Sequence, residues 1–325
     1  SPTGEDLHIG SVYIALYNYV FAQKNQGKFI VRIEDTDRER YVQGAEAKML
    51  DSLDWVGIPR DEDVSTGCKY APYRQSERLF LYKKYASELI GKGAAYYCFC
   101  TTERLVALRN EQTRRHLPPM YDGLCKSIPH EKARQLSLTQ SYVVRLNVPD
   151  NGVTEFTDLV RGKIKFDNKL IDDQVLLKSD GFPTYHLAVV IDDHLMEISH
   201  VIRGEEWISS TPKHVILYQV FGWELPQFAH LPLLRNPDKS KLSKRKNPVW
   251  MSWFRQQGIL PEAILNYLGT LTWSMPDGRD LFSVEDMIVH FDLKNLKTTA
   301  PIFDVVKLKW FSKQYLMKKE IAEVI

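Results

Sequence analysis

The feature that most constrains the fold of this chain is a turn at residues 1–4 that leads into an apolar helical pattern. Pro2 and Gly4 bend the backbone there. Apolar side chains then recur at the spacing of one helix face, at Ile9, Val12, Tyr13, Leu16, Val20 and Phe21. His8 therefore lies at the mouth of a helix, where free backbone N–H groups and the helix dipole favour anions. Gly10 has no Cβ to block a closely bound ligand.

Taken alone, His8 has a simpler interpretation as a helix cap or a packed core residue. A second polar stretch, residues 239–246, holds five cations in eight residues. Such a stretch cannot form a core strand, and its simplest interpretation is a solvated or nucleic-acid-binding loop. A sharper hypothesis is a polyphosphate clamp, in which Lys241 and Lys244 neutralise the charge that develops on a departing pyrophosphate.

These two stretches resemble the paired signatures of the class I aminoacyl-tRNA synthetases. His8-Ile-Gly-Ser11 is similar to the "HIGH" signature, and Lys241-Leu-Ser-Lys-Arg245 is similar to the "KMSKS" signature. Three further segments resemble the glutamyl-tRNA synthetases: Ser1-Pro-Thr-Gly4, Arg32-Ile-Glu-Asp-Thr-Asp37 and Val201-Ile-Arg-Gly-Glu-Glu206. The resemblance follows essentially the whole chain in order.

The resemblance implies an enzyme that ligates L-glutamate to the 3′ end of tRNA(Glu) through a glutamyl-adenylate, with ATP and Mg²⁺ as cofactors. No enzyme nucleophile is needed, so positioning and charge stabilisation would carry the catalysis. The implied catalytic residues are His8, Lys241 and Lys244. The implied ATP-binding residues are His8, Gly10, Ser11, Lys241, Ser243 and Lys244.

The resemblance also implies that glutamate is bound by Ser1, Glu34, Tyr185 and Arg203. Glu34 would hold the amino group, and Arg203 would form a bidentate pair with the side-chain carboxylate. Glutaminyl relatives lack an arginine at this position, so Arg203 favours glutamate over glutamine. Without the resemblance, the ordinary interpretation of such an arginine is a structural ion pair.

Three cysteines suggest a metal site. Cys98-x-Cys100, followed after a loop by Cys125, can present three thiolates to one tetrahedral Zn²⁺. In some glutamyl-tRNA synthetases a fourth ligand lies two residues after the third cysteine, where this chain has Ser127. A tRNA-modifying relative, the glutamyl-queuosine synthetase, uses a tyrosine four residues before that cysteine, and Tyr121 matches this position. Three buried cysteines without a metal remain the alternative.

Bulk composition limits the remaining choices. A net charge of +2 over 325 residues gives no general indication of nucleic-acid binding, which would need a local basic face. No apolar run is long enough to span a membrane. Four cysteines in so long a chain do not form a disulfide framework, which is typical of a reducing compartment. We therefore expect a cytoplasmic monomer.

The predicted fold class is α/β, a Rossmann-type nucleotide-binding domain with two additional domains. The expected division is a Rossmann domain in two halves (1–75 and 172–232), an inserted α+β acceptor-end-binding domain (76–171), the loop and a helical stem-contact domain (233–315), and the start of an anticodon-binding region (316–325). We also expect a fragment, because relatives have a strand before the N-terminal turn and continue beyond residue 325.

Local patterns predict the individual elements. Helices are expected at 45–56, from 76, and at 211–221, 261–271, 283–291 and 304–315. Strands are expected at 28–33, 96–100, 174–178, 184–191 and 200–203. His186 and His194, with the paired Asp192 and Asp193, raise a metal hypothesis that we reject, because their spacing along a strand separates them.

Three other functions remain open. A glutamyl-queuosine synthetase would load glutamate onto a modified tRNA base, but those relatives end before the helices that follow Pro261. A glutaminyl enzyme is disfavoured by Arg203. A catalytically silent tRNA-binding paralogue is disfavoured by the intact signatures at residues 1–11 and 241–245.

Overall fold

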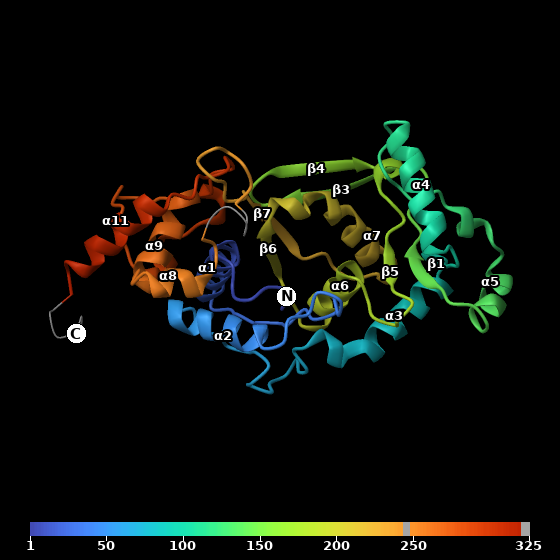
Figure 1. The fold of residues 1–325 in the computed structure, drawn as a ribbon, viewed down its shortest axis with the longest axis horizontal. Helices are drawn as coiled ribbons and strands as arrows, with labels where there is room; N and C mark the ends of the chain where they lie inside the picture. Colours follow the sequence, from blue (N-terminus) through green and yellow to red (C-terminus); the bar gives the residue numbers. More distant parts are fainter. Residues whose placement is uncertain (243–247, 320–325) are drawn as a thin grey trace.

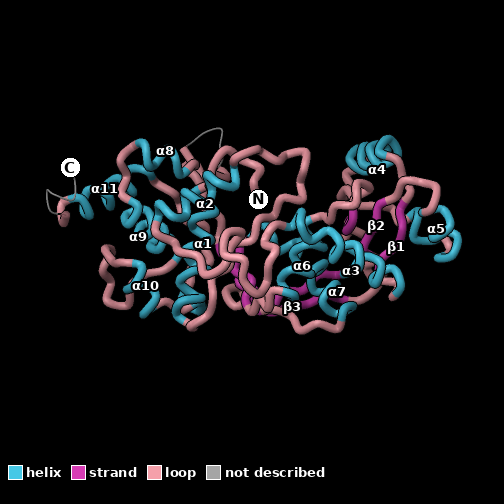
Figure 2. The backbone as a smooth tube through the Cα atoms, turned by 90° about the horizontal axis from the view of Figure 1, so that it is seen from below, coloured by secondary structure: helices cyan, strands magenta, loops and turns pink. Residues whose placement is uncertain are grey.

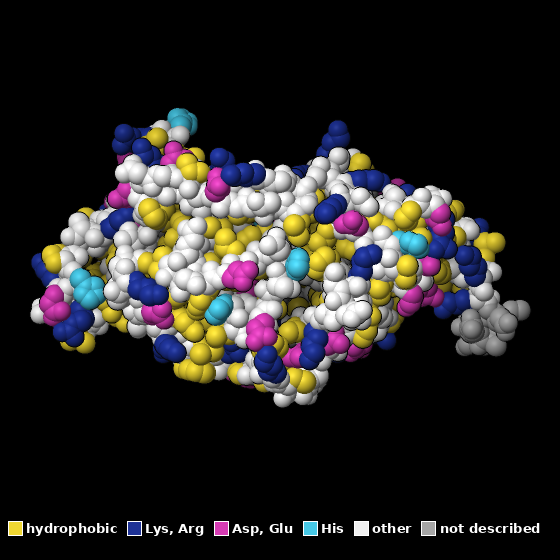
Figure 3. All heavy atoms as spheres, turned by 180° about the vertical axis from the view of Figure 1, so that it is seen from behind, with side chains coloured by type: hydrophobic (Ala, Val, Ile, Leu, Met, Phe, Trp, Pro, Cys, Tyr) yellow, Lys and Arg dark blue, Asp and Glu magenta, His cyan; other side chains and the backbone are white. Residues whose placement is uncertain are grey.

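A computed structural model describes residues 1–242 and 248–319 of the chain. The molecule is elongated, with the N-terminus near its middle and α11 at one end (Figure 1). Helices of the last third of the chain form that end, and a small sheet with α4 and α5 forms the other, as the view in Figure 2 also shows. On the back face, hydrophobic side chains gather over the middle of the molecule (Figure 3).

The described residues form these elements. The α-helices are α1 (Ile9–Lys24), α2 (Ala45–Val56), α3 (Leu79–Gly91), α4 (Thr102–Arg114), α5 (His130–Ser137), α6 (Tyr185–Leu195), α7 (Thr211–Phe221), α8 (Met251–Gln256), α9 (Pro261–Thr272), α10 (Val284–His290) and α11 (Val305–Leu316). The 3₁₀ helices are η1 (Gln75–Arg78), η2 (Leu124–Ser127), η3 (Asn168–Leu170), η4 (Glu205–Ser210) and η5 (Leu293–Asn295). The strands are β1 (Ala95–Cys98), β2 (Val143–Leu146), β3 (Val153–Asp158), β4 (Gly162–Asp167), β5 (Val175–Leu177), β6 (His200–Gly204) and β7 (Gln227–Leu231).

The strands form two sheets, so the predicted mixture of helix and sheet is confirmed. One sheet has the order β1-β2-β5 and is antiparallel. The other has the order β4-β3-β7-β6, with β6 and β7 parallel and β3 and β4 paired as an antiparallel hairpin. Asp158 at the end of β3 is aligned with Phe228 of β7, so the β3–β4 hairpin extends the sheet that carries β6.

Helix α1 forms as the apolar spacing predicts, and it joins the middle of the molecule to the C-terminal helices. Its side chains pack against β6, α9 and α10. Two tyrosines add polar contacts to α9: Tyr13 bonds the Thr272 hydroxyl at 3.1 Å, and the Tyr17 hydroxyl donates to the Gly269 carbonyl at 3.0 Å. Leu16 is fully buried, which contributes about 1.5–3 kcal/mol to stability.

Most of the other predicted helices are confirmed. Helix α2 ends at Gly57 and α7 ends at Gly222, each in the left-handed conformation that glycine adopts readily. Ser283 and Asp286 form the predicted capping box at the start of α10. The helix expected from residue 76 begins as the 3₁₀ turn η1 and becomes α-helical at Leu79. None of the described helices is long and apolar enough to cross a membrane.

The strand predicted at 184–191 is wrong, because this segment is helix α6. Its run of apolar residues is buried against α3, α7 and β5, so the pattern lacks the polar face of a surface helix. The reason given for rejecting a metal at Asp192 and Asp193 therefore fails. The structure supplies another: Asp192 accepts from the Arg78 Nε at 2.7 Å, and Asp193 lies 2.9 Å from the Arg32 guanidinium.

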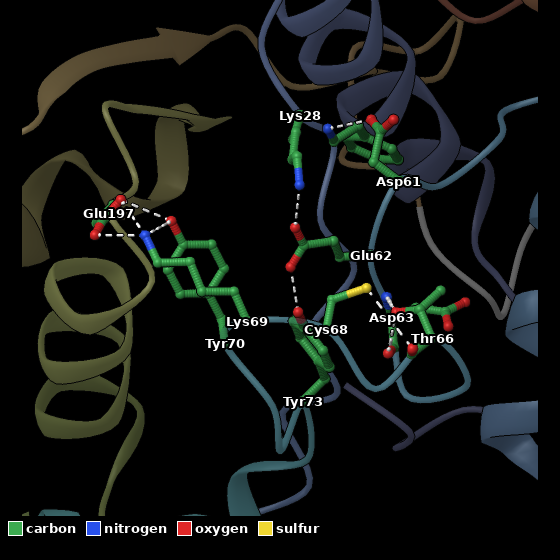
Figure 4. Close-up of polar contacts among 11 residues, drawn as sticks. Lys28, Asp61, Glu62, Asp63, Thr66, Cys68, Lys69, Tyr70, Tyr73 and Glu197 are labelled. Atoms are coloured by element: carbon green, nitrogen blue, oxygen red, sulfur yellow. Dashed lines mark hydrogen bonds and ion pairs between the residues drawn. The ribbon is translucent and has the colours of Figure 1, made fainter.

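The strand predicted at 28–33 is also wrong, since this segment makes only single bridges, from Ile30 to Glu62 and from Ile33 to Arg74. Individual backbone hydrogen bonds hold it, among them Val31 N–H to the Glu62 carbonyl at 2.9 Å and Ile33 N–H to the Tyr73 carbonyl at 2.8 Å, and side chains add to them. Lys28 bonds the buried Glu62 carboxylate at 2.7 Å, and the Tyr73 hydroxyl donates to the same carboxylate. Figure 4 shows Lys28 and Tyr73 pointing at Glu62 from opposite sides. The segment is therefore positioned without a regular ladder.

Candidate active site

The segment that follows the lysine-rich stretch lies against the chain around His8. The backbone N–H of Ile9 donates to the Val249 carbonyl at 2.7 Å, and that of Met251 donates to the Leu7 carbonyl at 3.0 Å. His8 and Trp250 form the antiparallel bridge between these bonds, with their ring centroids 6.0 Å apart. The chain that leaves the lysine-rich stretch is thus attached directly to the start of α1.

Asp6 reinforces this junction from beneath. Its Oδ1 accepts the Ser52 hydroxyl at 2.7 Å and the Leu7 backbone N–H at 2.6 Å, while its Oδ2 accepts the Ser252 backbone N–H at 2.6 Å. Burial raises the pKa of Asp6, but the hydrogen bonds from Ser52 and Ser252 outweigh it and hold the pKa below its ordinary value. One carboxylate therefore ties the N-terminal turn to α2 and to α8.

His8 caps α1, as one of the two interpretations of the sequence expects. Its Nδ1 accepts the backbone N–H of Gly10 at 2.9 Å. A Cβ at residue 10 would lie 3.1 Å from that nitrogen, so glycine leaves room for the cap as well as for a ligand. Ser11 is exposed on the first turn of the helix, where its backbone N–H bonds the His8 carbonyl.

Lys241 lies at the described end of the lysine-rich stretch. Its side chain is exposed, and its carbonyl accepts from the Asn236 side chain at 3.3 Å. The next residue, Leu242, is buried and bonds back to the Leu234 carbonyl. Ser243 and Lys244, which the sequence also assigns to ATP, lie outside the described residues.

Three of the four predicted glutamate-binding residues line one cavity. Glu34, Tyr185 and Arg203 surround a volume of about 260 Å³ between residues 30–34, α6 and β6. Ser1 is exposed and does not line this cavity. The structure therefore brings together an acidic group, a phenol and a guanidinium from three distant parts of the sequence.

Arg203 is buried and surrounded by neutral partners. Its Nε donates to the His230 Nε2 at 3.1 Å, its Nη1 donates to the Tyr185 hydroxyl at 3.1 Å, and its Nη2 donates to the Thr211 hydroxyl at 2.9 Å. Its Nη1 also lies 3.4 Å from the His214 Nδ1. In the described part of the chain, Arg203 takes part in no ion pair with a carboxylate. Burial raises the pKa of Tyr185 to about 12, so its hydroxyl stays protonated.

In the same cavity, the carboxylate of Glu34 lies 3.2 Å from the Arg32 guanidinium. Arg32 also pairs with Asp193 at 2.9 Å. Burial raises the pKa of Asp193 to about 6 despite this arginine. Sequence reasoning missed Arg32 and Asp193 as parts of the site. Arg32 could have been found, because it is the first residue of the Arg32–Asp37 motif and its positive charge can balance the carboxylates that follow it.

The three predicted metal-ligating cysteines converge, together with Tyr121. The sulfur atoms of Cys98, Cys100 and Cys125 all lie within 4.8 Å of one another. The Tyr121 hydroxyl lies 3.5 Å from the Cys98 sulfur and 3.4 Å from the Cys100 sulfur, and it accepts the Cys125 backbone N–H at 2.9 Å. Ser127 instead bonds the Leu124 carbonyl in its own turn. The donor set, three sulfurs and one phenolic oxygen, fits tetrahedral Zn²⁺.

Comparison with known proteins finds similar sequences and a similar solved structure. The chain is 53% identical to the glutamate–tRNA ligase of Acidothermus cellulolyticus, over 100% of this chain and 64% of that protein. It is 51% identical to that of Fusobacterium nucleatum, again over 100% of this chain and 64% of the relative. The glutamate-tRNA synthetase structure from Elizabethkingia anophelis matches with a TM-score of 0.92 at 41% identity, over 98% of this chain and 69% of that one.

The chain thus spans slightly less than two thirds of the length of these two curated relatives. Residues 1–310 match the family described as tRNA synthetases class I (E and Q), catalytic domain. This match includes α1 with His8, the cavity around Arg203 and the described part of the lysine-rich stretch. The chain therefore belongs to the class I tRNA synthetases (E and Q), and what it shares with them is their catalytic domain.

Proposed function

We propose that this chain catalyses the ATP-dependent ligation of L-glutamate to the 3′ end of tRNA(Glu) through a glutamyl-adenylate. The observation that carries the proposal is the buried guanidinium of Arg203, which lines the cavity and has no carboxylate partner among the described residues. A buried charge is costly without a counter-charge. The side-chain carboxylate of glutamate supplies that charge, whereas the neutral amide of glutamine does not.

Glu34 lines the same cavity and would hold the amino group of the substrate, since a carboxylate attracts an ammonium group in a partly buried site. Tyr185 would line the side-chain end beside Arg203. Ser1 is assigned to glutamate by the family resemblance alone. The proposed amino-acid site thus offers a carboxylate for the substrate ammonium group and a guanidinium for its side-chain carboxylate.

The proposed chemical step has two parts. The substrate α-carboxylate attacks the α-phosphorus of ATP and pyrophosphate departs; the acyl group then passes to a ribose hydroxyl at the tRNA 3′ end. His8, Gly10 and Ser11 would bind the phosphates at the start of α1. Lys241, Ser243 and Lys244 would neutralise the departing pyrophosphate, and Mg²⁺ would share its charge. The attachment of residues 249–251 to residues 7–9 supports this proposal, because it brings the segment that follows the lysine-rich stretch to the start of α1.

We assign the domains as the sequence predicts, with residues 1–75 and 172–232 as a Rossmann-type domain. Residues 76–171 would bind the tRNA acceptor end, except that β3 and β4 within this range belong to the sheet of β7 and β6 in the first domain. Residues 233–315 would contact the tRNA stem, and residues 316–325 would begin the anticodon-binding region. The exposed α4, which carries no buried residue, supports an outward-facing role for the second segment. All four cysteines are free, which supports a reducing cytoplasm, and the chain would act as a monomer.

A structural zinc is part of the proposal. Cys98, Cys100 and Cys125 would bind it with Tyr121 as the fourth ligand, and it would fasten β1 to η2 without entering the reaction. The tyrosine also favours a second candidate, an enzyme similar to the glutamyl-queuosine synthetase. The helices α9, α10 and α11 favour the first, because those relatives end before this region.

ATP–pyrophosphate exchange on the full natural protein tests these functions. Glutamate and glutamine are compared, each with and without tRNA(Glu). Exchange that is specific for glutamate and requires tRNA is the expected result. Glutamate exchange without tRNA would favour the queuosine-type enzyme, and exchange with neither amino acid would favour a silent tRNA-binding paralogue.

A further inference from the structure

Arg203 is held by a polar network that reaches beyond the cavity. The His230 Nε2, which accepts the Arg203 Nε–H, belongs to an imidazole whose Nδ1 lies 2.6 Å from the Asp158 Oδ2. All three side chains are at least 92% buried, with exposed fractions of 8% for Arg203, 0% for His230 and 1% for Asp158. Asp158 ends β3 and His230 lies in β7, so the pairing of these two strands builds the contact.

The hydrogen-bond geometry selects one tautomer of His230. Its Nε2 must be an acceptor, because an arginine Nε can only donate. Its Nδ1 must therefore carry the proton and donate to Asp158. Burial lowers the pKa of His230 even though Asp158 acts against it, so the ring stays neutral. Asp158 thus fixes the protonated nitrogen on the side away from Arg203.

A second histidine pair repeats this arrangement on the other edge of the guanidinium. The His214 Nδ1 lies 3.4 Å from the Arg203 Nη1, and its Nε2 lies 3.1 Å from the His186 Nδ1. The tautomer that fits both contacts carries its proton on Nε2, which donates to His186. Burial lowers the pKa of His214 well below its ordinary value. Both histidines therefore present lone pairs to Arg203.

A neutral acceptor orients a guanidinium but leaves its positive charge available to a ligand, whereas a carboxylate does not. A carboxylate in direct contact would orient the guanidinium but would also neutralise it and compete with a substrate carboxylate. Asp158 acts through one imidazole, so it orients Arg203 without direct contact. The protein contacts account for the Nε–H, both N–H groups of Nη1 and one of Nη2 within the described residues. Among the described residues, one N–H of Nη2 has no protein partner and remains for a ligand. The bidentate pair expected from the sequence would need a second N–H that a protein acceptor now holds.

We propose that Asp158 and His230 are positioning residues for Arg203, and that the tautomer set by Asp158 orients the guanidinium that selects a carboxylate over a carboxamide. This inference rests on the proposed function, in which Arg203 binds the side-chain carboxylate of glutamate. It assigns to β3 and β7 a part in amino-acid specificity, although neither Asp158 nor His230 lines the cavity.

The decisive variant is Asp158→Asn, because it can reverse the tautomer without changing the size of the side chain. The Asp158 Oδ1 accepts the backbone N–H groups of Val160 at 3.0 Å and Arg161 at 2.9 Å. The oxygen of the new amide must occupy this position, so its NH₂ group faces the His230 Nδ1. The proton of His230 then moves to Nε2, where it opposes the Arg203 Nε–H.

The experiment measures aminoacylation kinetics of the full natural protein with glutamate, and activation of glutamine. Asp158→Asn should raise the KM for glutamate on the order of 10-fold or more and reduce the preference over glutamine, with the KM for ATP unchanged. Asp173→Asn is the matched control. Asp173 accepts hydrogen bonds from the Tyr96 hydroxyl and from the Val148 backbone N–H and makes no contact with Arg203. The KM of the Asp173→Asn variant for glutamate should therefore stay at the parent value.

A second substitution at His230 tests whether Asp158 and His230 position Arg203 or only stabilise the fold. His230→Gln can present an amide oxygen to Arg203 whatever residue occupies position 158, so adding it to Asp158→Asn should lower the KM for glutamate again. His230→Asn reaches Asp158 but not Arg203, and should raise this KM more than His230→Gln does. If Asp158→Asn fails to fold, the comparison of His230→Asn with His230→Gln still tests whether His230 positions Arg203.

Two outcomes would overturn the proposal: an unchanged KM for glutamate in folded Asp158→Asn, or equal KM values for His230→Asn and His230→Gln. The proposed function has its own test. If Arg203→Lys leaves the KM for glutamate unchanged, Arg203 does not recognise the substrate, and the function assigned to the cavity fails. If Arg203→Lys raises it while the Asp158 and His230 variants do not, the function stands and the positioning role is wrong.

Discussion

Asp6 accepts the backbone N–H of Ser252 at 2.6 Å although 246 residues separate them in the chain. The contact fixes the segment that leaves the lysine-rich stretch against the turn that precedes His8. A buried carboxylate in the N-terminal turn therefore holds the segment that follows the lysine-rich stretch, although the two are remote in sequence.

Asp6→Asn should loosen this junction. The amide oxygen would stay on Leu7 and Ser52, which leaves an NH₂ group facing the Ser252 N–H. The lost hydrogen bond should lower the free energy of unfolding by about 1–3 kcal/mol and reduce kcat. Urea denaturation and aminoacylation kinetics measure both effects. Asp304→Asn is the matched control, because Asp304 caps α11 and asparagine caps helices equally well. Equal losses in the two variants would contradict the proposed junction.

Lys244→Ala should lower kcat by about 10²–10³-fold, by analogy with the loss of a donor to a developing negative charge. The KM for glutamate should change far less, since the lysine would act on the departing pyrophosphate. Steady-state pyrophosphate exchange separates the two constants. Lys294→Ala removes an exposed lysine from η5 and should leave both unchanged. A change confined to KM would refute the role of Lys244.

His186 should make the protein less stable in acid. Burial, with the charges of Lys213 and Arg203, lowers its pKa to about 4 from 6.5 in the unfolded chain. Between these values the unfolded state binds the proton and the folded state does not, so stability falls as the pH falls from 6.5 towards 4. Between pH 7 and pH 5 this costs about 2 kcal/mol.

The comparison of His186→Gln with the parent isolates this contribution, because the variant lacks the titrating group. Denaturation at pH 7 and pH 5 should show a smaller loss of stability in the variant. His290→Gln removes an exposed imidazole at the end of α10 and should behave like the parent. If His186→Gln loses as much stability in acid as the parent, the folded protein must accept the proton at His186.

The cysteine cluster should hold about one zinc ion per chain when the protein is purified without chelator. Cys125→Ser should reduce the zinc content and the thermal stability, and Tyr121→Phe should weaken zinc binding while leaving three sulfurs in place. Metal analysis and thermal denaturation measure these changes. Cys68→Ser is the control, because Cys68 is exposed and lies outside the cluster. Metal-free protein with parental stability would favour three ordinary cysteines.

The sequence predicted those parts of the fold in which each element carries its own signal. Helix α1 has an apolar face and α10 has a capping box, and both patterns are local. Helix α6 was mistaken for a strand because Val189, Val190 and Ile191 form an apolar, β-branched run that is buried on all sides, and periodicity cannot distinguish such a helix from a buried strand.

In the candidate site, too, only residues with a local sequence signal could be predicted. Glu34 and Arg203 were predicted to act together because each lies in a recognisable motif, and Tyr185 because it matches a residue of the family that the chain resembles. Asp158 and His230 belong to no motif, and their contact depends on the register of β3 against β7. Register between strands that are distant in sequence follows from the whole packed sheet, and no local pattern encodes it.

The packing of α1 against α9 and α10 also sets the order in which the chain can fold during synthesis. The apolar face of residues 9–24 leaves the ribosome long before its partners at residues 261–290 exist. At about 5–20 residues per second, the part of that face that α9 and α10 cover stays exposed for roughly 12–50 s. Strand β6 also packs against α1 and is synthesised earlier. Proteolysis of ribosome-bound chains should therefore cut within α1 less often once β6 has emerged and stop only after α10 has emerged; full protection of α1 before α9 has emerged would contradict this order.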